Sequence, residues 1–297
     1  MQDWNRGPVA APHSILTCSA ANPTGEESAA RGMRKEDIQR APHLTKWRIW
    51  LEGWAPLHLR LDPARERRIE IMLDILQSLD RSPLRVLDLG AGPGDIAGRV
   101  LERFPDSMVT AVDLDPAMSR IGKEALKRFG ARITWITADI REVGGIDSSP
   151  SWSHDAVLCS QVLYGWNASR INTFYRDLHR HLRDRTAVLI NDFFDWEPSS
   201  NSLTTVANRI RELQIARGDR VDKMSFAAEW AAWWDPISRD PEMSPEVKSR
   251  NERICGEQAA PTPLPLEVHI HSLREAGFRQ VEVVWQQMQS RILLGFA

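Results

Sequence analysis

Glycines and aspartates recur where short apolar segments end in the middle of this chain. The first such segment, 86–89, runs into Gly90-Ala91-Gly92-Pro93-Gly94 and then into a helical pattern. Glycine permits a tight turn and lets the backbone approach a ligand where a side chain would collide. About twenty residues later, Asp113 ends a second apolar segment. A carboxylate in that place can accept both hydroxyls of a ribose, so the spacing predicts a cofactor that contains a nucleoside.

The charge beside this turn distinguishes between nucleoside cofactors. A dinucleotide fingerprint has the form G-x-G-x-x-G, with a helix N-terminus directed at a pyrophosphate. Here Asp95 stands where the third glycine belongs, and Asp88 lies two residues before Gly90. Two carboxylates would repel a pyrophosphate and attract a cofactor that carries an ammonium group. The turn therefore disfavours an NAD-dependent oxidoreductase.

Five segments, in this order, resemble the motifs of class I S-adenosylmethionine-dependent methyltransferases. Residues 86–94 resemble the first motif, an apolar strand followed by an acid and G-x-G-x-G, and residues 112–118 resemble the second, an acid followed by a helix that starts with proline. Residues 138–140 (Ala-Asp-Ile) are similar to the third motif and 155–164 to the fourth. The Ala-Gly-Phe of 273–278 resembles the turn before the last two strands of this family. The resemblance implies S-adenosylmethionine as the cofactor.

The resemblance assigns the methionine and ribose parts of the cofactor to the first two motifs. It implies that the backbone of Gly90, Ala91 and Gly92 lines these parts. Asp88 is expected near the ammonium group, and Asp113 is expected to bind the ribose hydroxyls.

The adenine is assigned to residues that follow the second and third strands. Leu114 and Met118 are expected to flank the ring. Asp139 is expected to accept from the adenine amino group, and Ile140 to donate its backbone N–H. An aspartate at such a place can also cap a helix or a turn, but five motifs together favour binding.

Methyl transfer itself requires few catalytic residues. A sulfonium is a strong electrophile, so a dry site that holds the nucleophile at near-attack distance supplies much of the catalysis. The resemblance places Ser160 and Gln161 beside the sulfonium. Tyr164, Asp192 and His269 are candidates to orient or deprotonate an acceptor, although packing or capping would equally explain Tyr164 and His269.

The elements that would position these residues alternate along the chain as in a parallel α/β sheet. The predicted strands are 85–89, 109–113, 132–137, 155–160, 186–193, 280–285 and 291–296. The predicted helices of this part are 95–104, 117–129, 169–183 and 266–276. Near-continuous apolar strands indicate that helices cover both faces. The fold class is therefore α/β, a Rossmann-like methyltransferase fold with a seven-stranded, mostly parallel sheet.

The rest of the chain is predicted to surround this core. Residues 1–44 are expected to be a mobile extension and 45–80 an N-terminal helical cap, whose second helix starts at Asp62-Pro63. The S-adenosylmethionine-binding core takes 81–194 and 266–297, and 195–265 forms a lid-like helical insertion after the fifth strand. Such an insertion would lie near the strand ends where ligands bind.

Tryptophans gather in the two flanking helical parts. The two clusters are Trp47, Trp50 and Trp54, and Trp230, Trp233 and Trp234. An aromatic lid would suit a flat or apolar small molecule and would exclude water. The alternative is that both clusters only hold helices to the core.

Composition limits the other functions. With a net charge of −2 and no basic stripe, the chain gives no indication of nucleic-acid binding, which disfavours an RNA-modifying transferase. Its three separated cysteines indicate neither a metal site nor a disulfide scaffold, and no apolar run suggests a membrane span. We expect a cytoplasmic enzyme with a small-molecule acceptor. A non-catalytic S-adenosylmethionine-binding partner is the alternative, and the oligomeric state, with a homodimer among the options, stays open.

Overall fold

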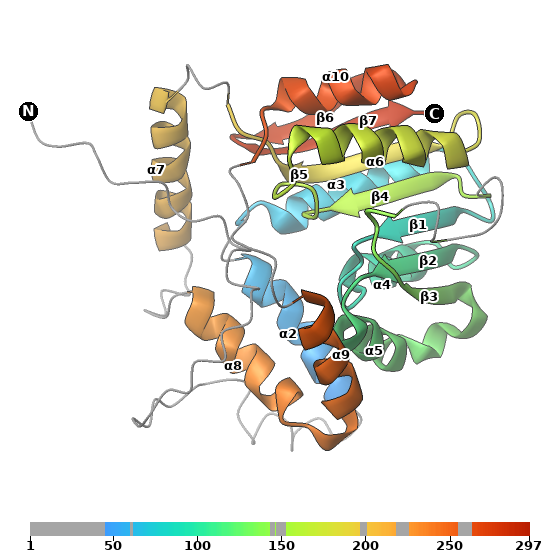
Figure 1. The fold of residues 1–297 in the computed structure, drawn as a ribbon, viewed down its shortest axis with the longest axis vertical. Coiled ribbons are helices and arrows are strands. Elements are labelled where there is room, and N and C mark those ends of the chain that lie inside the picture. The colour runs from blue at the N-terminus through green and yellow to red at the C-terminus, as the bar shows by residue number, and fades with distance from the viewer. Residues whose placement is uncertain are drawn as a thin grey trace, which may run out of the picture.

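A seven-stranded sheet in the order β3-β2-β1-β4-β5-β7-β6 forms the centre of the computed structural model (Figure 1). The structure describes residues 45–59, 62–142, 146, 153–196, 201–217, 226–254 and 263–297. The strands are β1 (Arg85–Leu89), β2 (Met108–Asp113), β3 (Ile133–Thr137), β4 (Ala156–Ser160), β5 (Ala187–Phe193), β6 (Arg279–Gln287) and β7 (Ser290–Phe296).

The first five strands pair in parallel, and β7 runs antiparallel between β5 and β6. The predicted seven-stranded, mostly parallel sheet is confirmed. Strand order reverses between β1, whose chain continues to β2, and β4 on its other side. In open α/β sheets ligands bind outside the carboxyl ends of the strands at such a switch point. The topology therefore directs attention to the ends of β1 and β4.

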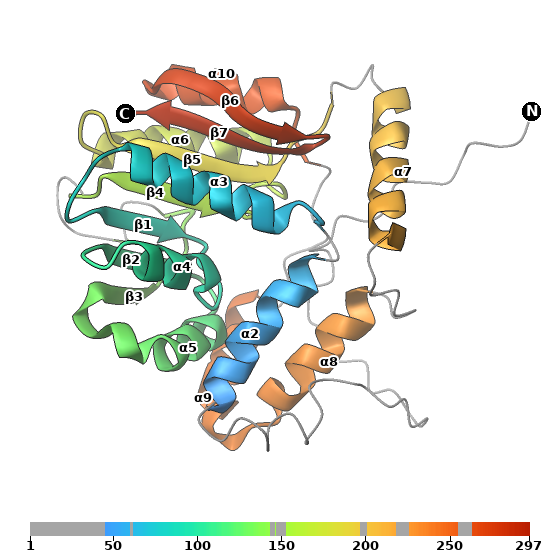
Figure 2. The ribbon, with the colours of Figure 1, turned by 180° about the vertical axis from the view of Figure 1, so that it is seen from behind.

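Helices cover both faces because successive strand residues point to opposite sides. From β1, Val86 packs toward α3 (Arg65–Ser78) and α4 (Asp95–Arg103), whereas Leu87 and Leu89 pack toward the opposite helices. Those opposite helices are α6 (Ala168–His181) and α10 (Leu266–Ala276) (Figure 2). Because both faces of β1 are covered, residues 86–89 of this strand are all buried and do not alternate in exposure.

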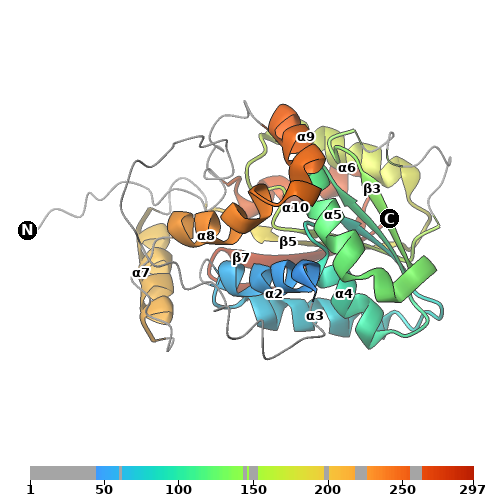
Figure 3. The same ribbon diagram turned by 90° about the horizontal axis from the view of Figure 1, so that it is seen from below.

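A second group of helices lies together at one side of the sheet (Figure 3). The group consists of α2 (Lys46–Leu59), α5 (Pro116–Ala125), α8 (Phe226–Ser238), η3 (Pro241–Met243) and α9 (Ser244–Ile254). Trp47 and Trp50 of α2 pack against Ile121 of α5, with Ile237 from α8 completing the cluster. Helix α7 (Asn201–Arg217) stands apart from this group (Figure 1).

Two local predictions need correction. The helix predicted over 117–129 ends as α5 at Ala125 and continues as the 3-10 helix η1 (Lys127–Arg132), in which Gly130 has a non-helical φ of 55°. The helix predicted to follow Asp62-Pro63 is present as α3, but it begins at Arg65, so Pro63 does not occupy its first position. Asp62 instead accepts from the backbone N–H of Ala64 and pairs with Arg68.

Several other predictions concern residues or boundaries that the structure does not describe. The extension over 1–44 lies outside the described residues, and the boundaries of the cap, core and insertion stay predictions. Within the described ranges, no helix is long and apolar enough to cross a membrane. The same ranges hold no cluster of His, Cys, Asp or Glu with the geometry of a metal site.

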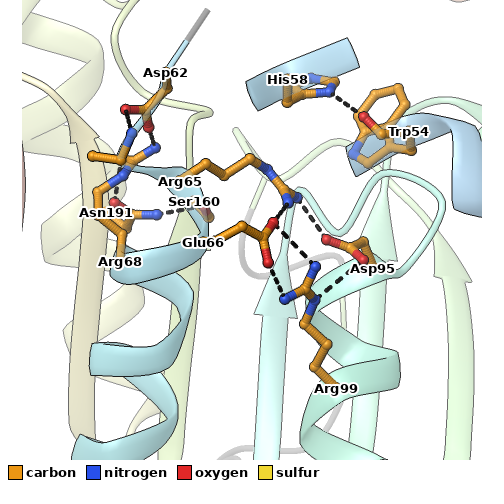
Figure 4. A network of polar contacts seen from close by, with 11 residues as sticks. Trp54, His58, Asp62, Arg65, Glu66, Arg68, Asp95, Arg99, Ser160 and Asn191 are labelled. Atoms are coloured by element: carbon orange, nitrogen blue, oxygen red, sulfur yellow. Dashed lines mark hydrogen bonds and ion pairs between the residues drawn. The ribbon is translucent and has the colours of Figure 1, made fainter. Parts of the chain in front are cut away.

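The guanidinium of Arg68 is fully buried beneath the carboxyl end of β5 (Figure 4). It pairs with Asp62 and donates to the side-chain oxygen of Asn191, whose amide in turn donates to Ser160 Oγ at 2.8 Å. Burial lowers the pKa of Arg68 to about 10, and the nearby charge of Asp192 opposes that shift. The arginine thus connects α3 to the ends of β5 and β4.

Replacing Arg68 by methionine removes this connection and leaves Asp62 and Asn191 buried without their partner. We expect the free energy of unfolding to fall by about 3–5 kcal/mol, the usual cost of breaking a buried pair from one side. Urea denaturation measures it. Arg67→Met, at an exposed position of the same helix, should change the value by less than about 0.5 kcal/mol. Equal losses in the two variants would contradict a structural role for the buried charge.

Candidate active site

A cavity of about 290 Å³ opens at the carboxyl ends of β1, β2 and β4. The structure brings together on its wall all eleven residues that the resemblance assigns to the cofactor, and Tyr164 as well. Asp192 and His269, the other two candidates for chemistry, do not line it. Helices α2, α8 and α9 contribute further residues to the wall, so the cavity is formed jointly by the core and its flanking helices.

The turn after β1 has the backbone that its glycines were expected to allow. Gly90 and Gly92 have positive φ values of 76° and 55°. A Cβ on Gly90 would lie 2.3 Å from Val162 Cγ2, so the turn and the loop after β4 approach each other more closely than any side chain would permit. A Cβ on Gly92 would lie 3.3 Å from the Trp54 ring, which places that indole over the turn.

Asp113 ties the end of β2 to the glycine turn. One carboxylate oxygen accepts from the backbone N–H of Gly92 at 2.7 Å and the other from that of Asp115 at 2.8 Å. Burial, reinforced by the charge of Asp115, raises the pKa of Asp113 to about 6. These two bonds fix the carboxylate at the cavity wall.

Asp88 is the most unusual group in the cavity. It is 1% exposed, and its Oδ2 has no hydrogen-bond partner among the described residues. Burial, with the charges of Asp113 and Asp95, raises its pKa to about 7. A buried carboxylate without a partner is costly, and a cation placed against it would remove the cost. The carboxylates of this wall therefore fit a cofactor that carries an ammonium group.

Asp95 is paired within the chain, which corrects part of the charge argument. Its carboxylate accepts from Arg65 Nη2 at 2.7 Å and from Arg99 Nε at 3.3 Å (Figure 4). The two arginines also share Glu66. Asp95 thus has compensating cations that the sequence argument did not foresee, and discrimination against a pyrophosphate depends mainly on Asp88.

The residues expected around adenine lie on the neighbouring side of the cavity. Asp139 accepts from the backbone N–H of Arg141 at 2.9 Å and from its Nε at 2.8 Å. Burial opposes ionisation of Asp139, but the bonds from Arg141 outweigh it and lower the pKa of the carboxyl. Met118 is buried against Leu57 and Trp230, so the flanking helices reach this end of the cavity.

Asp192 acts on the loop after β4 rather than on the cavity. Its Oδ2 accepts from the backbone N–H groups of Val162 at 3.1 Å and Leu163 at 2.7 Å. Burial raises its pKa to about 7, opposed by these backbone bonds and by the charge of Arg68. Gln161, which begins the loop, has a positive φ of 56°. The carboxylate therefore holds a strained loop in place.

His269 lies in the interior behind the sheet. It is 1% exposed, its Nδ1 is 2.8 Å from the Tyr175 hydroxyl, and its ring packs edge-on against Phe194. Burial lowers its pKa to about 3. The structure thus separates His269 from the cavity that holds Tyr164.

The tryptophan clusters divide between the two roles considered for them. Trp54 and Trp230 line the cavity, with ring centroids 5.9 Å apart. Trp47 and Trp50 pack on α5, and Trp233 donates its indole N–H to the Trp50 carbonyl at 3.0 Å. Each cluster therefore contributes one ring to the cavity wall and uses the others to hold helices together.

Several cavity residues had not been predicted. They are His58, Arg65, Arg141, Trp166, Arg250 and Ile254. His58 follows Trp54 by four residues on one helix face, and this spacing could have indicated it. Its Nδ1 lies 3.0 Å from the Trp54 carbonyl oxygen, and burial lowers its pKa to about 4. Arg250 donates to Asp115 at 2.6 Å across 135 residues of sequence, for which the sequence carries no local signal.

Comparison with known proteins agrees with this geometry. Residues 86–185 match the methyltransferase domain family. A malonyl-[acyl-carrier protein] O-methyltransferase of Geobacter sulfurreducens is 36% identical over 69 residues, 23% of this chain and 26% of that protein. A trans-aconitate 2-methyltransferase of Streptomyces avermitilis is 33% identical over 116 residues, 37% of this chain and 40% of that protein. The matches thus span less than half of these relatives.

A solved structure from Nostoc punctiforme, provisionally described as an O-methyltransferase, has the same fold. Its TM-score is 0.50 at 15% sequence identity, over 84% of this chain and 60% of that chain. Together with the match over residues 86–185, this likeness supports a class I S-adenosylmethionine-dependent methyltransferase domain. The family predicted from the five motifs, and with it S-adenosylmethionine as the cofactor, is confirmed.

The raised pKa of Asp88 predicts a pH dependence of cofactor binding. An ammonium group needs the ionised carboxylate, which is present above the pKa of about 7 and is lost as the pH falls through it. Titration calorimetry from pH 8 to pH 6 should therefore show affinity for S-adenosylhomocysteine falling by up to about tenfold per pH unit below 7. Protonation of Asp113, with a pKa of about 6, acts in the same direction at the lower end.

Asp88→Asn is the variant that isolates this effect. It should bind more weakly at pH 8 and lose most of the pH dependence between 8 and 6.5. Asp106→Asn, a change of the same kind at an exposed aspartate before β2, should keep both the affinity and the profile. A profile that persists in Asp88→Asn would mean that another group titrates.

Proposed function

We propose that this protein transfers a methyl group from S-adenosylmethionine to a small-molecule acceptor in the cavity at the ends of β1 and β4. The observation that carries the proposal is the unpartnered carboxylate of Asp88, buried in one cavity with the glycine turn and Asp113. When bound, the cofactor supplies a methyl group on a positively charged sulfur, which an acceptor displaces in line. The residues of the chain bind, orient and exclude water.

Cofactor binding in this proposal follows the wall of the cavity. Asp88 balances the ammonium group, and Asp113 binds the ribose hydroxyls while it keeps the turn closed. Asp139 and the backbone of Ile140 bind the adenine edge. The apolar side chains that flank the ring are Leu114 and Met118.

The acceptor side is built from the loop after β4 and the flanking helices. Ser160 and Gln161 lie beside the position of the transferred methyl, and Tyr164 orients the acceptor. Trp54 and Trp230 exclude water, which strengthens the electrostatic interactions of the site. Asp192 acts as a positioning residue through the loop, and His269, away from the cavity, receives no chemical role.

The first test is a comparison of ligands. Calorimetry should detect S-adenosylmethionine and S-adenosylhomocysteine and give no response to NADH. Tight NADH binding without a response to the sulfonium compound would refute the proposal. Methyl-labelled cofactor, offered with a panel of small molecules, should then give a labelled product. Cofactor binding without any transfer across a broad panel would favour a non-catalytic binding partner.

Asp113→Ala tests the assignment of the ribose. Loss of both the ribose contact and the bond to the Gly92 N–H should weaken S-adenosylhomocysteine binding at least about tenfold, a change of roughly 1.4 kcal/mol. Circular dichroism and urea denaturation should show that the fold persists. Asp106→Ala, at an exposed position before β2, should bind normally. Unchanged affinity in Asp113→Ala would show that the ribose binds elsewhere.

A further inference from the structure

The arginines on the wall of the cavity are already neutralised by the chain itself. Arg65 Nη2 lies 2.7 Å from Asp95, Arg141 Nη2 lies 2.5 Å from Asp139, and Arg250 Nε lies 2.6 Å from Asp115. The Arg250 guanidinium is also stacked over the Trp234 ring at 4.5 Å. These three are the cationic side chains that the described wall contributes, with no lysine among them. Each already pairs with a carboxylate of the chain, which reduces its attraction for a further anion.

Negative charge is in excess on the same wall. Five aspartates line the cavity, namely Asp88, Asp95, Asp113, Asp115 and Asp139, against the three arginines. A bound cofactor with one net positive charge would still leave the carboxylates in the majority. The raised pKa values of Asp88 and Asp113, about 7 and about 6, report the same surplus together with burial. A carboxylated acceptor would therefore enter against a repulsive potential.

Five aromatic rings line the cavity beside the residues assigned to the cofactor. They come from three parts of the chain: Trp54 and His58 from α2, Tyr164 and Trp166 from the segment after β4, and Trp230 from α8. The rings of Trp54 and His58 are in contact, with centroids 4.1 Å apart and planes tilted by 37°. Ile254 of α9 adds an aliphatic side chain. Such surfaces favour flat, apolar ligands, because ring faces gain from stacking and from exclusion of water.

We propose that the acceptor is an uncharged, planar aromatic molecule, and not a polycarboxylate. The inference rests on the proposed function and narrows its substrate. In the transfer, the nucleophilic atom of the acceptor bonds to the methyl carbon while the carbon–sulfur bond breaks and its electron pair stays on sulfur; a proton carried by that atom is released to solvent when the product leaves. A small ring system also suits a cavity that must hold the cofactor as well.

Two ligands with the same ring system separate the effect of a negative charge on affinity from the effect of the ring. 2-Naphthol and 6-hydroxy-2-naphthoate share the naphthalene ring and the hydroxyl, and the second adds a carboxylate. With the protein saturated by S-adenosylhomocysteine, calorimetry should give an affinity for the naphthol at least about tenfold higher than for the naphthoate or for trans-aconitate. Equal or tighter binding of either acid, or no binding of the naphthol, overturns the proposal. Failure to bind S-adenosylhomocysteine would refute the proposed function instead.

Trp230→Ala tests the aromatic wall. It should weaken naphthol binding about tenfold and change S-adenosylhomocysteine affinity by less than about threefold. Trp230→Phe, which keeps a ring, should recover most of the loss and guards against an unfolded alanine variant. Trp285 of β6 packs on the side of the sheet that α3 and α4 cover and does not line the cavity. Trp285→Ala is therefore the matched control and should bind the naphthol normally. If Trp285→Ala and Trp230→Ala lose the same affinity, the wall is not the binding surface.

Asp95→Asn tests whether the negative charge of the cavity wall disfavours a carboxylated ligand. It removes one carboxylate and releases Arg65 from its closest partner. The ratio of naphthol to naphthoate affinity should therefore fall at least about threefold, mainly through tighter naphthoate binding. Glu66 of α3 still pairs with Arg99 of α4 at 2.6 Å, so the contact between the two helices is retained. An unchanged ratio would show that the cavity does not select on charge.

Discussion

The buried guanidinium of Arg68 is the interaction on which the arrangement of the site depends. It pairs with Asp62, just before α3, and donates a hydrogen bond to Asn191 near the end of β5. Asn191 in turn donates to Ser160 at the end of β4. Removing a cation from water costs several kcal/mol, and its hydrogen-bond and ion-pair partners offset this cost only when their geometry is good. Such a group therefore contributes less to net stability than to fixing which segments lie together. The segments that it fixes are those that carry the acceptor side of the cavity.

A second constraint is the contact between the glycine turn and the loop after β4. Val162 occupies the space that a Cβ on Gly90 would need, and Asp192 holds that loop by two backbone bonds. The loop in turn keeps Gln161 in a left-handed conformation that few residues adopt. Because both sides of this contact are fixed, the cavity between them is largely preformed. Preformed sites lose less entropy on binding, which suits a reaction that depends on positioning.

The sequence predicted those features that come from local geometry. The strands, the glycine turn and the aspartates that follow strands were predicted correctly because a short run of residues determines them. The pairs Arg65–Asp95, Arg68–Asn191 and Arg250–Asp115 span 30, 123 and 135 residues, and a single sequence gives no sign of such partners. For the same reason Asp95 was read as an unpaired charge. Helical periodicity placed the tryptophans on one face, but it could not show which neighbour covers each ring.

The division between core and flanking helices explains why the sequence identifies the cofactor but not the acceptor. The matched domain, 86–185, carries every residue assigned to the cofactor, whereas Trp54, Trp230 and Arg250 lie outside it. In folds of this kind function depends on sites added to a common core, so relatives that share the core need not share an acceptor. Here the added helices bring rings together with an arginine that is already paired. The arginines of the cavity wall are thus paired within the chain before any acceptor arrives, and the proposed selection of an acceptor depends on the flanking rings and on the remaining excess of carboxylates.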